Sequence, residues 1–171
     1  ELGQICALLP MRHHSQRVPG KNYRPLAGKP LYQHILSTLL ACTEIAQIVV
    51  DTDSEPIIQG LQADGAHSSE FSGAVQSGRI LVLERPEHLR GDQVPMNEIL
   101  AYDTSQVQAD FYLQTHSTNP LLRPESISRA ARAFSAAYPA YDSLFSVTRL
   151  QTRLWDQLGR AMNHNPAVLL Q

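Results

Sequence analysis

The chain has 171 residues, 43% of them apolar and 18% charged, a balance typical of one folded domain that excludes a largely disordered protein. A net charge of −2 gives no support to a nucleic-acid partner, and no segment reaches the roughly 18 apolar residues of a membrane span. Cys6 lies in an apolar run and Cys42 near the end of an expected helix, which favours buried free thiols. We therefore expect a cytoplasmic protein with no membrane or nucleic-acid partner.

Five short apolar segments recur along the chain, and their apolar character is nearly continuous rather than alternating. Such segments are typical of parallel strands that are buried on both faces. They lie at residues 5–9, 48–50, 80–83, 111–113 and 144–147. Pro30 and Pro124 each suit the first turn of a helix between strands. The pattern predicts a Rossmann-like α/β/α fold of three layers with a mostly parallel sheet.

Two regions interrupt this alternation of strands and helices. Residues 64–78 are rich in serine and glycine and are expected to form a surface loop. Residues 149–171 contain Trp155 and show no clear period, so their apolar residues need a partner surface. We therefore predict an α/β domain over residues 1–148. Residues 149–171 are expected to begin a C-terminal, dimerisation-type extension that continues beyond Gln171.

The segment from residue 10 to residue 30 follows the first expected strand and is strongly cationic. Residues 1–43 hold five Lys or Arg and a single acid, whereas residues 44–171 hold nine Lys or Arg and fifteen acids. Arg12 can fork onto phosphate oxygens, Lys21 is a compact point charge, the Ser15 hydroxyl can donate, and Gly20 permits a tight turn. In open α/β sheets, ligands bind at the edge formed by the carboxyl ends of the strands, and this segment leaves the first strand at that edge. A solvated basic surface loop is the alternative, but position, sign and residue types together predict a polyphosphate site.

The same segment resembles the signature of the acylneuraminate cytidylyltransferases, the CMP-sialic acid synthetase family. The resemblance begins with ALLPMRHHSQRVPGKNYRPLAGKPL and continues in register through IVVDTDSEPI, LERPEHLRGD, FYLQTHSTNPLLRPESI and DSLFSVT. It implies a Rossmann-like fold and the transfer of CMP from CTP to a nine-carbon 2-keto sugar acid, a nonulosonic acid, with release of pyrophosphate and use of Mg²⁺. It also implies a homodimer, in which the late region of the chain reaches the partner.

The resemblance assigns roles to individual residues of this sequence. Those carried over are Arg12, Ser15 and Lys21 for the triphosphate, Asn22, Arg85 and Asp92 for the nucleotide, and Gln114 and His116 for the sugar acid. Catalysis would fall to the two cations that neutralise the leaving pyrophosphate, Arg12 and Lys21. No protein nucleophile is needed, and no metal ligand is assigned within residues 1–171.

The sequence departs from the family pattern at three places. His13 and His14 stand where the family often has two glycines, which leaves open how the turn contacts phosphate. The element that begins at Gln114 is longer than usual, which suggests a modified sugar pocket. The acidic pair that holds the metal in the family is expected beyond Gln171.

Three other functions remain open from the residues alone. Relatives that make CMP-ketodeoxyoctonate share much of the cationic loop but usually lack the asparagine found here at position 22. Asp51 and Asp53 form a D-x-D pattern, by which many sugar-nucleotide-dependent glycosyltransferases hold a metal. A module that binds a nucleotide without turnover is the third possibility.

Overall fold

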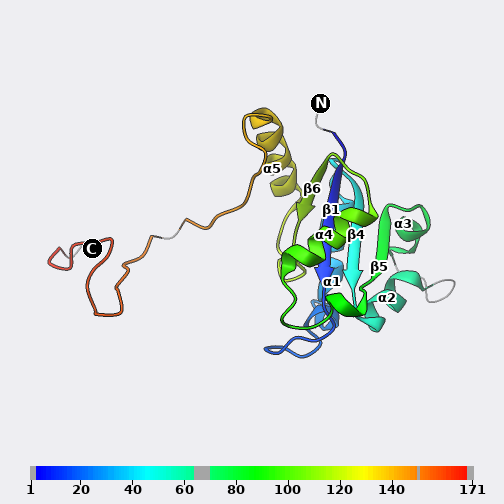
Figure 1. Ribbon diagram of the computed structural model, residues 1–171, viewed down its shortest axis with the longest axis horizontal. Coiled ribbons are helices and arrows are strands. Elements are labelled where there is room, and N and C mark those ends of the chain that lie inside the picture. The colour runs from blue at the N-terminus through cyan, green and yellow to red at the C-terminus, as the bar shows by residue number, and fades with distance from the viewer. Residues whose placement is uncertain (1–2, 64–69, 150, 169–171) are drawn as a thin grey trace.

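A parallel sheet of four strands forms the centre of the protein, whose computed structural model describes residues 3–63, 70–149 and 151–168 (Figure 1). Its strands are β1 (Ile5–Met11), β4 (Ile45–Thr52), β5 (Ile80–Glu84) and β6 (Phe111–Gln114). They lie in the order β5-β4-β1-β6, and each neighbouring pair is parallel. The first four predicted strands are thereby confirmed. Because β6 lies on the opposite side of β1 from β4, the order of strands reverses beside the carboxyl end of β1.

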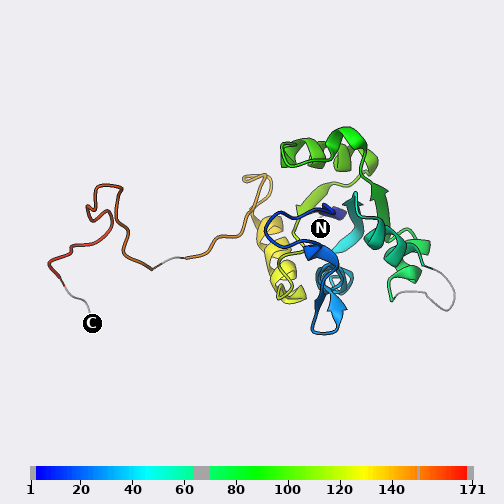
Figure 2. The same cartoon turned by 90° about the horizontal axis from the view of Figure 1, so that it is seen from below.

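Helices cover both faces of this sheet (Figure 2). On one face lie α1 (Leu31–Leu40), α2 (Glu55–Gln62), α3 (Ser72–Gln76) and α5 (Pro124–Ala137). On the other face lies α4 (Met96–Gln106). The predicted three-layer α/β/α fold is therefore confirmed. The two predicted helix starts are also confirmed, since α1 begins directly after Pro30 and α5 begins at Pro124.

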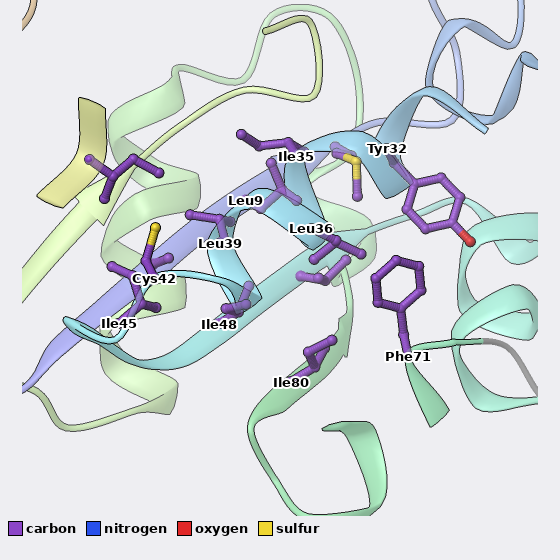
Figure 3. Packing of buried hydrophobic residues seen from close by; sticks show 14 of the residues in the cluster. Leu9, Tyr32, Ile35, Leu36, Leu39, Cys42, Ile45, Ile48, Phe71 and Ile80 are labelled. Atoms are coloured by element: carbon purple, nitrogen blue, oxygen red, sulfur yellow. The ribbon is translucent and has the colours of Figure 1, made fainter. Parts of the chain in front are cut away.

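Successive side chains of β1 point to opposite faces of the sheet, and both faces are covered. This explains why the sequence of the strand is continuously apolar. Ala7 and Leu9 point into the larger cluster of buried residues under α1, where Figure 3 shows Leu9 close to Ile35 and Leu39. Cys6 and Leu8 point into the smaller cluster under α4. Each β1 residue is buried on one face or the other, so no position along the strand has to be polar.

Two of the predicted elements are wrong. Residues 144–147, predicted as a fifth strand, are irregular, and Phe145 and Val147 are 81% and 78% exposed. Residues 72–76, predicted as part of a loop, form the short helix α3, which the buried Phe71 anchors to the larger cluster. The rest of that predicted loop, residues 64–69, lies outside the described residues. An apolar run does not by itself show what covers it. A high content of serine and glycine does not by itself exclude a short helix.

The chain after α5 leaves the body of the molecule as an extended segment (Figure 1). Between residues 139 and 168 the described residues form only turns and one isolated bridge, between Trp155 and Ala161. Large apolar side chains along it are exposed, among them Tyr141, Leu158 and Met162. Among the described helices, none has both the length and the apolar character needed to cross a bilayer.

Candidate active site

A cleft of about 370 Å³ lies at the carboxyl edge of the sheet, the edge at which open α/β sheets bind their ligands. Three connections meet there: the one after β1, the one from β5 to α4, and the one after β6. Its lining includes Arg12, Lys21, Asn22, Arg85, Asp92, Val94, Met96, Ile99, His116, Ser117 and Thr118. The chain therefore brings most of its predicted site residues into a single cleft, from positions that are far apart in sequence.

The connection after β1 is held in place by polar and aromatic contacts. The backbone N–H of His13 donates to the Asp53 carboxylate at 2.6 Å, and His13 Nδ1 lies 3.0 Å from Ser54 Oγ. The His13 ring also stacks on Tyr23, with ring centroids 5.4 Å apart. These contacts anchor the cationic loop to the turn between β4 and α2. The loop then continues into a small hairpin of β2 (Pro25–Leu26) and β3 (Lys29–Pro30).

Gly20 gives this loop a conformation that other residues adopt only with strain. Its φ is 65°, and a Cβ placed there would lie 2.7 Å from the ring of Tyr23. The turn at Gly20 leads directly into the single 3₁₀ turn Lys21–Tyr23. Gly20 therefore fixes the position of Lys21 at the cleft, in agreement with the tight turn predicted there.

We expect Gly20→Ala to destabilise the protein by about 2–4 kcal/mol, because it combines a left-handed backbone conformation with a close contact to Tyr23. Gly28→Ala is the matched control, since Gly28 also has a positive φ of 85° but has no atom within 4 Å of the Cβ position. That control should cost only about 1 kcal/mol. Urea unfolding measures both losses, and equal losses would show that the contact with Tyr23 does not matter.

Asn22 connects the two loops that lie on either side of the cleft floor. Its Nδ2 donates to the backbone carbonyl of Arg12 at 2.8 Å, and its Oδ1 accepts from Ser117 Oγ at 2.6 Å. Asn22 and Ser117 are both buried. These two bonds link the connection after β1 to the connection after β6, at the point where the strand order reverses. Asn22 thus shapes the floor of the cleft, in addition to the nucleotide contact that the resemblance predicts for it.

The cations of the cleft differ in how strongly they are paired. Arg12 forms an ion pair with Asp92, which also accepts from Gln16 Nε2, and the Arg12 and Asp92 side chains are 49% and 41% exposed. An ion pair this exposed contributes little to stability. Within the described part of the chain, the Lys21 ammonium has no ion-pair or hydrogen-bond partner. An unpaired cation beside a weakly paired one makes the cleft attractive to a polyanion.

Arg85 lies at the inner end of the cleft in a buried ion pair. Its Nε donates to Asp51 Oδ2 at 2.9 Å and its Nη2 to the Asp51 backbone carbonyl at 3.2 Å, and the two side chains are 4% and 0% exposed. Burial raises the pKa of Asp51, while Arg85 acts in the opposite direction. Asp53 accepts from His13, as described above. The two acids of the D-x-D pattern therefore have structural partners, which does not favour a shared metal.

Two predicted residues do not line the cleft. Ser15 lies farther along the loop after β1, and Gln114 ends β6 with its Nε2 3.2 Å from the ring of His116. Their proposed contacts to phosphate and sugar stay predictions. His116 itself lines the cleft, and Gln114 can orient its ring.

Two further residues were missed at the sequence level. Ser117, the partner of Asn22, lies three residues after Gln114 in the same family-like element, so a signal for it was present. Asp103 is fully buried on α4 beside Asp51, and burial raises its pKa to about 7, with the Asp51 carboxylate as the second cause. An isolated acid in a helix gives no such signal, because only the fold shows that it is buried.

Comparison with known proteins identifies relatives of this chain. CMP-N,N'-diacetyllegionaminic acid synthase of Legionella pneumophila is 34% identical over 132 residues, covering 74% of this chain and 51% of that protein. The 3-deoxy-manno-octulosonate cytidylyltransferase of Escherichia coli is 27% identical over 126 residues, covering 74% and 44%. The chain thus spans about half the length of the curated relatives it matches.

Two solved structures have a fold similar to that of this chain. A structure of CMP:2-keto-3-deoxy-manno-octonic acid synthetase complexed with CTP aligns with a TM-score of 0.59 and 22% identity, covering 78% of this chain and 48% of that one. A cytidylyltransferase from Leptospira borgpetersenii aligns with a TM-score of 0.53 and 16% identity, covering 80% and 50%. The family model described as cytidylyltransferase matches residues 6–167. The chain therefore belongs to the cytidylyltransferase family.

Proposed function

We propose that this protein transfers CMP from CTP to a nonulosonic, sialic-acid-like 2-keto sugar acid and releases pyrophosphate. The observation that carries the proposal is the cleft itself, in which Arg12 and the unpaired Lys21 meet at the carboxyl edge of the sheet. Membership of the cytidylyltransferase family supports CTP as the nucleotide. The acylneuraminate type is supported by the sequence motifs and by Asn22, which relatives that use ketodeoxyoctonate usually lack.

In the proposed reaction, the anomeric hydroxyl oxygen of the sugar acid attacks the α-phosphorus of CTP. A new bond forms between these atoms, the bond from the α-phosphorus to the bridging oxygen breaks, and the hydroxyl proton is released. Lys21 and Arg12 hold the phosphate oxygens and neutralise the charge that develops on the departing pyrophosphate. Asn22 and Arg85 contact the nucleoside, and His116, oriented by Gln114, contacts the sugar acid.

Mg²⁺ is expected for such a reaction, but the described residues do not fit a site for it. They contain no group of three or more His, Cys, Asp or Glu side chains that could hold a metal ion. Among the described residues that line the cleft, Asp92 is the one carboxylate, and it already bonds to Arg12 and Gln16. The steps proposed above are therefore assigned to the cations of the cleft, Arg12 and Lys21, alone among the described residues.

We also propose that the segment from residue 149 onwards packs against a second copy of the protein. Its support is the exposure of Trp155, Leu158 and Met162, which are 52%, 73% and 66% exposed. Two buried free cysteines, Cys6 and Cys42, agree with a cytoplasmic enzyme. Light scattering coupled to size exclusion would give the mass of a dimer, and a monomer at every concentration would contradict the proposed dimer.

The reaction is tested by measuring pyrophosphate release with CTP, UTP and ATP, each combined with N-acetylneuraminic, N,N'-diacetyllegionaminic, pseudaminic and ketodeoxyoctonic acid. We expect release only with CTP, and with a nonulosonic acid in preference to ketodeoxyoctonic acid. Preference for ketodeoxyoctonic acid would reassign the substrate. CTP binding without release under any condition would indicate a nucleotide-binding module, and transfer from a sugar nucleotide to an acceptor would favour a glycosyltransferase.

A further inference from the structure

Beneath the cleft, two buried carboxyl groups face a single arginine. Asp51 and Asp103 are both 0% exposed, and they approach each other from β4 and α4. Asp51 Oδ2 accepts from Arg85, whereas Asp51 Oδ1 and both oxygens of Asp103 have no hydrogen-bond donor among the described residues. A buried carboxylate without a donor is strongly unfavourable. A proton on Asp103 would remove one of the two buried charges and would let Asp103 donate to Asp51 Oδ1.

The surrounding groups leave this pair with one compensating charge. Arg85 is the cation that contacts Asp51, and Asp53 adds a negative charge near Asp51. From β1, the thiol of Cys6 faces Asp103, and burial together with that acid raises the Cys6 pKa to about 11, so the thiol stays neutral. Arg85 can balance one ionised acid of the pair, so the other acid is favoured in its protonated form, and the charge of Asp53 adds to this preference.

Arg85 has one terminal nitrogen to spare. Its Nε and Nη2 bond to Asp51, and Nη1 has no partner among the described residues, although Arg85 lines the cleft. These N–H groups are available to a ligand in the cleft only if no second carboxylate attracts them. The protonation state of Asp103 therefore influences whether the Arg85 N–H groups can donate hydrogen bonds to a nucleotide.

We propose that Asp103 is a positioning residue for the nucleotide: as a neutral acid it donates a hydrogen bond to Asp51, which holds Arg85 with its free N–H groups turned to the cleft. This inference rests on the proposed function, in which Arg85 contacts CTP. Loss of the Asp103 proton creates a second buried carboxylate, which competes with CTP for the Arg85 N–H groups. Because burial and Asp51 raise the pKa of Asp103 to about 7, this loss occurs near neutral pH.

The test compares the pH dependence of CTP affinity in the wild-type protein and in Asp103→Asn, measured by calorimetry from about pH 6 to about pH 8.5. The asparagine amide can donate to Asp51 as the neutral acid does, but it cannot ionise. At the acidic end the two proteins should bind CTP within about twofold of each other, and at the basic end the wild type should bind at least about fivefold more weakly. Titration of CTP is common to both proteins and cancels in the ratio of their affinities.

Two variants control this comparison. Glu98→Gln makes the same carboxyl-to-amide change on the same helix at an exposed position, and its affinity ratio to wild type should not change with pH. Asp103→Leu removes the donor and should bind CTP more weakly than Asp103→Asn at every pH. A ratio of wild type to Asp103→Asn that stays constant across the range would overturn the inference.

Failure of the proposed function would look different. If none of these proteins binds CTP at any pH, the nucleotide site is wrong, whatever the state of the acid pair. The pair can still be followed by urea unfolding, since the wild type, which keeps Asp103, should lose stability relative to Asp103→Asn as pH rises. Absence of that relative loss, with or without CTP binding, would show that Asp103 does not hold the proton.

Discussion

Lys21→Ala is expected to lower kcat/KM for CTP by about 10²–10³-fold while leaving the fold intact. Lys21 is a cation of the cleft with no partner among the described residues, so it is available to bind the triphosphate. This interaction strengthens as negative charge moves onto the departing pyrophosphate. Pyrophosphate release gives the rate, and circular dichroism with urea unfolding checks the fold. Arg12→Ala should also lower the rate greatly.

Lys29→Ala is the matched control for this variant. Lys29 is the other lysine of the chain and lies in the same cationic segment. Its Nζ lies 3.0 Å from Glu70 Oε1, and it is not one of the residues that line the cleft. Its loss should change kcat/KM by less than about twofold, because an exposed ion pair contributes little. Near-normal rates in Lys21→Ala, or equal losses in the two lysine variants, would contradict the assignment of the triphosphate site.

Arg85→Met is expected to destabilise the folded protein by about 3–5 kcal/mol near neutral pH, because it leaves Asp51 and Asp103 buried without their cation. Arg132→Met is the control, since Arg132 is 71% exposed and lies 3.8 Å from Glu44. That control should cost less than about 1 kcal/mol. Urea unfolding measures both, and similar losses in the two variants would show that the buried ion pair is unimportant.

The effect of Arg85→Met should also depend on pH, with a sign fixed by Asp103. The pKa of Asp103 is raised from 3.8 to about 7, so the folded protein holds this proton more tightly than the unfolded chain does. The resulting stabilisation is complete below about pH 4 and is lost progressively as pH rises to about 7. Without Arg85 both acids ionise less readily, so Arg85→Met should cost less at about pH 5 than at about pH 8. A cost that does not change with pH would contradict this electrostatic explanation.

Much of the fold was predictable because burial on both faces leaves a clear signal in sequence. The segments that became β1, β4, β5 and β6 are continuously apolar, and prolines mark the starts of α1 and α5. The segment at residues 144–147 has the same apolar character but pairs with no strand in the described structure. Apolar character records that a segment needs to be covered, not what covers it.

The candidate site was predictable where a residue's chemistry is local and not where it depends on burial. Arg12, Lys21 and Asn22 lie in the connection after β1, so the end of that strand places them at the cleft. Asp51 was noticed as part of a D-x-D pattern, but its partner Arg85 is distant in sequence and the ion pair appeared only with the fold. Asp103 gave no signal at all, because a buried acid and an exposed acid look alike in a helix sequence.

Isothermal calorimetry of the protein with CTP and Mg²⁺ tests most directly whether the cleft is a triphosphate site. Binding of one CTP per chain is predicted, with an affinity that falls as salt is added, because Arg12 and Lys21 are partly exposed cations, and that falls at least about tenfold in Lys21→Ala. The absence of any binding heat for CTP across a range of temperatures, with the protein shown to be folded, would contradict the assignment.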